Sequence, residues 1–154
     1  MHRSGASAEE VLRGVHDDVE RDRAVARRQR YATHEHDRSA RALRDGIAAA
    51  LGVAPAIVIS DSFGRPWRLG IVDVALGVAG FAPLADLRGT PDADGRTMNA
   101  TIVAVADEIA SAAELASGKT SRRPVVLVRG APLPPGDGSV AVDVVMDPAQ
   151  DLFR

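Results

Sequence analysis

The chain has 154 residues, the size of one ordinary domain with tails. Its 45% hydrophobic and 26% charged residues are typical of a soluble globular protein, and its formal net charge of -2 gives no argument for binding nucleic acid or anionic membranes. The absence of cysteine excludes a disulfide scaffold, a cysteine zinc site, an iron–sulfur cluster and a thiol nucleophile. No apolar run approaches about 18 residues and no signal-peptide core follows Met1, so we expect a cytoplasmic protein.

Residues 1–33 are the least core-like part of the sequence. Four valines and Leu12 recur there at roughly helical spacing, and charged residues dominate positions 20–30, which predicts a charged helical arm or tail. Its arginines would form either a phosphate-binding face or, as is more common, a solvated helix surface. The adjoining residues 34–37 (HEHD) are all of types that can bind a metal ion. Because consecutive residues do not point to one side of a helix or strand, we expect a polar loop there.

A helical pattern begins near residue 37. Asp37 or Ser39 suits the cap of this helix, Gly52 suits its stop, and apolar residues between them are spaced three and four apart. Residues 56–59 (AIVI) predict a short buried strand because they are continuously apolar and rich in β-branched side chains. We expect a loop over residues 60–68, and the glycine-punctuated run that follows it fits either a strand or a helix.

The second half of the sequence alternates between the same kinds of element. Residues 87–95 predict a loop, and residues 99–117 predict a long helix that Gly118 stops. Residues 125–128 (VVLV) and 140–146 predict two strands that pair as a wide hairpin. Because strands and helices alternate, the expected fold class is α/β or α+β with a mixed sheet.

Side chains suited to ligand chemistry gather just after the first predicted strand. Asp61 stands where open α/β sheets place their ligands, and Arg65 and Arg68 offer planar guanidinium groups for phosphate or carboxylate oxygens. Gly64 lets a ligand approach the backbone, and Trp67 would wall a pocket or stack on a ring. These residues suit a metal-bound, phosphorylated or multiply anionic ligand, and a surface loop with an Asp–Arg pair and a buried tryptophan is an equally good interpretation.

Two further acids lie in the predicted second helix. Asp107 and Glu108, if close to Asp61, would complete a set of oxygen ligands for Mg²⁺ or Mn²⁺, although a solvated helix flank is the commoner role of such a pair. Asp73 is either a polar residue at a strand edge or another ligand. Residues 118–120 (GKT) look like the end of a P-loop, but Ala113 stands where that motif requires glycine, and a helix rather than a strand precedes them.

At these same residues the sequence resembles a known family, the coenzyme F420:L-glutamate ligases, also called gamma-glutamyl ligases. The signature segment is 59–68 (ISDSFGRPWR), and the likeness continues through 73–80 (DVALGVAG), 105–115 (VADEIASAAEL) and 124–130 (PVVLVRG). Residues 37–46 resemble the helix that enters the signature strand, and the final residues 151–154 (DLFR) are similar to the close of the ligase domain. The resemblance covers residues 34–154, which we expect to form a ligase-like domain.

The resemblance implies a reaction and a set of site residues. It implies an α/β fold that dimerises, with GTP as co-substrate, Mg²⁺ or Mn²⁺ as the metal and K⁺ as a helper ion. L-glutamate would be attached to the deazaflavin cofactor precursor through an acyl phosphate. It implies catalytic roles for Asp61, Arg65 and Arg68, with the two arginines on phosphate or carboxylate. The implied metal ligands are Asp61, Asp107 and Glu108, and the implied cofactor-binding residues are Ser62, Gly64 and Trp67.

The sequence also departs from the family pattern. The N-terminal half of the family is not recognisable in residues 1–33, and Thr101-Ile102 stands where the family has Thr-Glu, which removes one carboxylate. Two hypotheses follow. In the first, the chain is a ligase that is completed by a homodimer or by a partner chain that supplies the missing half. In the second, it is a truncated non-catalytic homologue that retains metal, nucleotide or partner binding.

Overall fold

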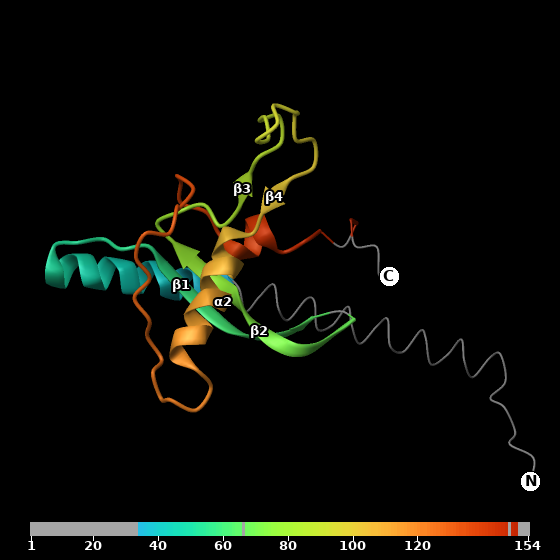
Figure 1. Cartoon of the computed structure of the whole chain (residues 1–154). Coiled ribbons are helices and arrows are strands. Elements are labelled where there is room, and N and C mark those ends of the chain that lie inside the picture. Colours follow the sequence, from blue (N-terminus) through green and yellow to red (C-terminus); the bar gives the residue numbers. More distant parts are fainter. Residues whose placement is uncertain (1–33, 66, 148, 151–154) are drawn as a thin grey trace, which may run out of the picture.

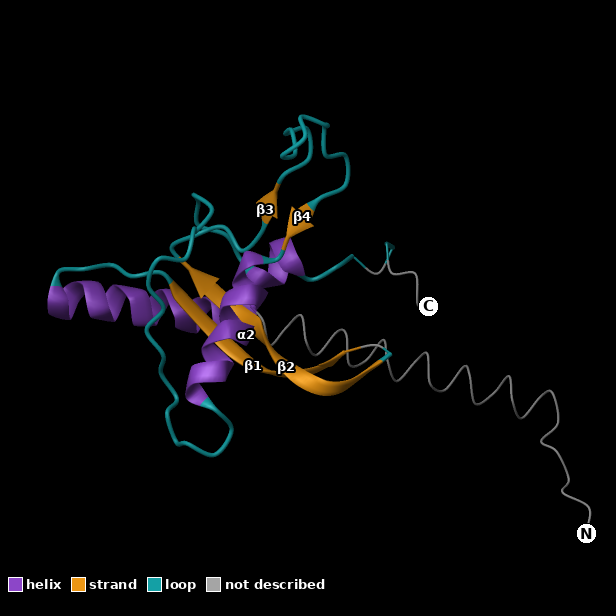
Figure 2. Cartoon of the chain, viewed as in Figure 1, coloured by secondary structure: helices purple, strands orange, loops and turns teal. Residues whose placement is uncertain are grey.

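The computed structural model describes residues 34–65, 67–147 and 149–150, so the predicted arm over residues 1–33 and the final four residues lie outside the described residues. Helices and small antiparallel sheets combine in one chain, which confirms the mixed α and β class (Figures 1 and 2). After a helix over residues 34–51 come β1 (Ile57–Arg65), β2 (Arg68–Ala79), β3 (Ala85–Asp86), β4 (Ile102–Val103), α2 (Val105–Ser117) and the π-helix η1 (Val140–Val144). Among the described residues, no helix is long and apolar enough to cross a membrane.

The first two strands form one long antiparallel hairpin, named the signature hairpin because it contains the signature segment 59–68. Ile57 pairs with Ala79 at its base and Arg65 pairs with Arg68 at its tip, with irregularities after Ile59 and after Gly64. The predicted strand 56–59 is therefore present but extends much further, and the predicted loop over residues 60–68 is wrong. Polar residues there remain in a strand because their backbone groups pair with β2, and only a tight turn at Trp67 (φ 54°) separates the strands. The ambiguous run 71–80 is β-strand as far as Ala79, the last residue of β2.

The helix over residues 34–51 includes the four residues predicted as a polar loop, so that prediction is wrong. Asp37 is not an exposed cap but is fully buried, and its carboxylate accepts hydrogen bonds from other elements. Gly52 ends the helix as predicted, with φ 71° and its N–H donating to the Ala48 carbonyl at 2.9 Å. The helix is thus fixed by a carboxylate at its first described turn and by a glycine at its end.

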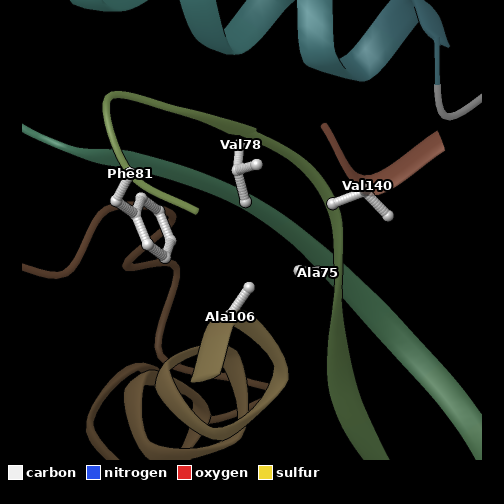
Figure 3. Packing of buried hydrophobic residues seen from close by; sticks show 5 residues of the cluster. All are labelled: Ala75, Val78, Phe81, Ala106 and Val140. Carbon is white, nitrogen blue, oxygen red and sulfur yellow. The ribbon is translucent and has the colours of Figure 1, made fainter. Parts of the chain in front are cut away.

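The core lies between β2 and α2, which crosses the hairpin (Figures 1 and 3). Its buried members are small or apolar side chains from β2, α2 and the segments after them: Ala75, Val78, Phe81, Ala106 and Val140. The predicted helix stop at Gly118 is confirmed, but α2 begins at Val105 rather than near residue 99, because Ile102 belongs to β4. Alanines at positions 106 and 110 are its buried residues, and such small side chains allow a helix to approach a strand closely.

Neither predicted C-terminal strand forms. Residues 125–128 have no regular secondary structure, and Val125 and Leu127 are largely exposed. Residues 140–144 form η1 instead of a strand. The reason is that the N–H groups of Val140 and Ala141, which a strand would give to a neighbour, are bonded to the Asp37 carboxylate. A distant side chain therefore overrides the β-propensity of this valine-rich segment.

The short β3–β4 ladder carries an exposed ion pair whose acid titrates abnormally. Hydrogen bonds from the Arg88 side chain and N–H lower the pKa of Asp86 from 3.8 to about 2. A lowered folded-state pKa means that the pair stabilises the fold above pH 3.8, and that this contribution is lost as the pH falls from 3.8 toward 2. We predict that NMR titration of the Asp86 carboxyl gives a midpoint near 2, and that Arg88→Gln returns it toward 3.8. An unchanged midpoint in the variant would contradict this cause.

Candidate functional site

Asp61 lies in the middle of β1, opposite Val74 of β2. It is exposed, and its Oδ1 accepts a hydrogen bond from the Ser62 N–H at 2.7 Å. The prediction placed this acid beyond the end of a strand in an open sheet, whereas the structure places it within the hairpin. Its carboxylate faces solvent and is available to a ligand.

The two arginines lie at the tip of the same hairpin. Arg65 and Arg68 form its last residue pair, and Arg65 Nη2 donates to the Leu69 carbonyl at 3.2 Å. Trp67 is 83% exposed rather than buried. Asp61 and Arg65 thus share one strand, and the structure brings Arg65 and Arg68 together. A Cβ added at Gly64 would meet no atom within 4 Å, so nothing in the described chain requires a glycine there to admit close contact.

Asp107 and Glu108 occupy the first turn of α2, where negative charge is favourable at the positive end of the helix dipole. Asp107 Oδ1 accepts a hydrogen bond from the Ala75 N–H at 2.8 Å, so this carboxylate ties α2 to β2, whereas Glu108 is exposed. In the described parts of the chain, no three His, Asp or Glu residues are grouped so that they could hold a metal ion. The assignment of Asp61, Asp107 and Glu108 as metal ligands therefore stays a prediction.

A polar network around Asp73 joins the two strands to the end of α2. Ser60 and Ser62 donate their hydroxyl groups to its carboxylate oxygens at 3.2 and 3.1 Å. Lys119, just after α2, lies 3.3 Å from the same carboxylate and also donates to the Ser62 hydroxyl. From the helix itself, Ser111 donates to the Asp73 carbonyl at 2.7 Å. Of these residues, the sequence pointed only to Ser62 and, as one of two alternatives, Asp73.

Lys119 also lines a basic groove that the sequence analysis missed. This open groove, about 400 Å³ in volume, lies where α2 ends and is lined by Glu114, Gly118, Lys119, Arg122, Arg123 and Pro124. Three cationic side chains against one carboxylate suit an anionic ligand. Arg122 has φ 56°, a left-handed conformation that is uncommon for a residue other than glycine and that marks a constrained turn. We name this surface the basic groove.

A signal for this groove was present in the sequence. The segment 119–123 (KTSRR) concentrates three basic residues directly after a predicted helix end. The comparison with a P-loop was correctly rejected, since α2 runs straight into this segment. Lys119 of this segment nevertheless contacts the signature hairpin.

Comparison with known proteins agrees with the resemblance of the hairpin. Residues 31–130 match the family described as F420-0:Gamma-glutamyl ligase. Similar relatives are the coenzyme F420:L-glutamate ligases of Methanocaldococcus jannaschii (41% identity, covering 77% of this chain and 47% of the relative), Haloarcula marismortui (42%, covering 75% and 44%) and Methanopyrus kandleri (43%, covering 77% and 48%). The chain spans about half the length of the curated relatives it matches. Because the family match covers well over half of its residues, this chain belongs to the F420-0:gamma-glutamyl ligase family.

Proposed function

We propose that this chain contributes the signature hairpin and the basic groove to a cytoplasmic, GTP-dependent ligase that joins L-glutamate to the coenzyme F420 precursor. The observation that carries the proposal is that Lys119 of the basic groove contacts the signature hairpin, with its Nζ 3.3 Å from the Asp73 carboxylate and beside the Ser62 hydroxyl. That contact puts the cationic side chains of the basic groove next to the segment by which the family is recognised. The relatives are named for this activity, and we propose it for a chain that spans about half of their length.

The reaction needs a phosphoryl transfer followed by an acyl transfer. A carboxylate oxygen of the precursor attacks the γ-phosphorus of GTP, the bond to the bridging oxygen breaks and GDP leaves. The glutamate amine then attacks the carbon of the acyl phosphate, phosphate leaves and the amine loses a proton. Cations near the phosphate oxygens favour the first step by offsetting charge, and Lys119, Arg122 and Arg123 are suited to that role. Arg65 and Arg68 would bind a carboxylate or phosphate group at the hairpin tip.

The fit of a divalent metal is weaker than the fit of an anion. Carboxylates are suitable ligands for Mg²⁺ or Mn²⁺, but Asp107 already accepts a backbone N–H, and the described residues do not group three such ligands. The described residues therefore do not by themselves fit the divalent metal that the family implies.

A second polypeptide surface is part of the proposal. Large apolar side chains are exposed on β2, on α2 and in the segment after α2, with Leu69 at 99%, Leu115 at 89% and Val125 at 85% exposed. Burying such side chains against another surface is favourable, so they support an additional chain that covers them. We propose that this is a second copy or a chain corresponding to the other half of the relatives.

The proposal is tested by incubating the chain with GTP, Mn²⁺, L-glutamate and the F420 precursor at high protein concentration. Mass spectrometry is expected to detect a product heavier by one glutamyl residue, and Lys119→Gln, which removes a cation from the basic groove, is expected to lower its yield strongly. Arg88→Gln is the control, because its side chain pairs with Asp86 away from the hairpin and the groove. If no product forms but GTP binds in a Lys119-dependent manner, the chain either is the non-catalytic homologue or needs the chain that corresponds to the other half of the relatives. If the chain forms no product and also does not bind GTP, the proposal is contradicted.

A further inference from the structure

Asp73 is a buried charge that the reaction described above does not use. It is only 9% exposed, in a strand whose following residues, Ala75 and Val78, belong to the apolar core. A carboxylate withdrawn from water is unfavourable unless hydrogen bonds and an opposite charge compensate for the lost hydration. An apolar residue would serve packing alone, so the carboxylate points to a further role.

Both oxygens of this carboxylate have partners from other elements. Oδ2 accepts the Ser60 hydroxyl, while Oδ1 accepts the Ser62 hydroxyl and lies 3.3 Å from Lys119 Nζ. Lys119 Nζ also donates to Ser62 Oγ and lies 3.7 Å from Glu114 Oε1. Ser62 and Asp73 lie within hydrogen-bond distance of Nζ and fix its position, whereas Glu114 is an ion-pair partner at 3.7 Å, so one of the three Nζ protons remains for a ligand.

We propose that Asp73 is a positioning residue for a polyphosphate subsite in the basic groove. It holds the Lys119 ammonium and the Ser62 hydroxyl at the hairpin end of the groove, while Arg122 and Arg123 line the remainder. A long lysine side chain loses rotamer freedom when it binds a ligand, and fixing it beforehand reduces that loss. This inference rests on the proposed function and identifies the residues that orient its phosphate chain.

The effect of removing the Asp73 charge separates positioning from simple electrostatics. Asp73→Asn removes a negative charge close to an anion site, so electrostatic attraction alone predicts tighter binding of a polyanion. Positioning predicts weaker binding, because the amide no longer holds Lys119 in place. We expect Asp73→Asn to weaken the binding of inorganic triphosphate by about tenfold, which corresponds to the loss of one charge-assisted hydrogen bond.

The measurement is calorimetric titration of the full chain with inorganic triphosphate. Lys119→Gln is expected to weaken binding to a similar extent, and Asp73→Asn should have little further effect in the Lys119→Gln background, because both changes remove the same interaction. Lys119→Arg keeps the charge at a half-exposed position where folding is not at risk, yet it changes the length and shape of the group, so it too should weaken binding several-fold. Arg88→Gln, which removes one positive charge elsewhere, should leave binding unchanged apart from a small general effect.

The outcomes distinguish this inference from the ligase proposal. Tighter or unchanged binding by Asp73→Asn would overturn the positioning role. If Asp73→Asn fails to fold, then unchanged binding by Lys119→Arg would overturn it instead, and so would a wild-type chain that does not bind triphosphate. Weaker binding in these variants, together with the absence of glutamylated product, would support the subsite and contradict only the ligase activity.

Discussion

Replacing Asp37 with alanine is expected to lower the free energy of unfolding by about 3–5 kcal/mol. The Asp37 carboxylate is fully buried and accepts hydrogen bonds from the N–H groups of Val78, Val140 and Ala141 at 2.9, 3.1 and 3.2 Å. It also accepts the Ser139 hydroxyl at 2.6 Å. Alanine would leave these donors without an acceptor in a place that water does not reach, and this explains the large expected loss.

Urea unfolding monitored by circular dichroism measures this loss. Asp37→Asn keeps the side-chain volume and one carbonyl oxygen, so we expect it to lose about half as much stability. Asp45→Asn is the matched control, because Asp45 lies on the same helix but is exposed, and we expect a change within about 0.5 kcal/mol. A decrease below about 1 kcal/mol for Asp37→Ala would show that the donors find other acceptors, contrary to this account.

Two glycine-to-alanine changes should shift stability in opposite directions. At Gly77 an added Cβ would lie 2.3 Å from the His36 carbonyl carbon and 2.6 Å from the Asp37 nitrogen. These are backbone atoms that no rotamer change can move, so the helix over residues 34–51 would have to shift away from β2. We expect Gly77→Ala to destabilise the chain by about 3 kcal/mol, at the upper end for overpacking.

Gly46 provides the control for this change. It lies inside the same helix, and an added Cβ would meet no atom within 4 Å. Alanine favours the helix over glycine, so Gly46→Ala should stabilise the chain by about 0.5–1 kcal/mol. The same denaturation experiment measures the stability of both variants. No loss of stability in Gly77→Ala would contradict the close contact between helix and hairpin, and a loss in Gly46→Ala would contradict the open space around that position.

Local sequence patterns predicted the elements whose structure is decided locally. The apolar run at 56–59 forms part of β1, and Gly52 and Gly118 end the helices as expected. The length of the hairpin was not predictable in this way. Its polar outer half is stabilised by pairing with β2 and not by burial, so composition alone indicated a loop.

Contacts between residues far apart in the sequence account for the remaining differences. Asp37 is a residue type common at helix caps, but its role in the core depends on backbone N–H donors that lie 41 to 104 residues away in the sequence. The same carboxylate makes η1 a helical turn although its sequence favours a strand. At the candidate site, the predicted residues of the signature hairpin lie together on two strands, but Lys119 reaches Ser62 only through the path of α2 over the hairpin.

The carboxylate of Asp37 also has a consequence for the order in which the chain folds during synthesis. Its N–H donors at positions 140 and 141 leave the ribosome more than a hundred residues after Asp37 itself. Until then the Asp37 carboxylate of a nascent chain lacks some of the hydrogen-bond donors that compensate for its burial. The loop that must close between Asp37 and these donors is nearly as long as the domain. We therefore expect the last step of folding to follow the emergence of residues 139–141 from the ribosome.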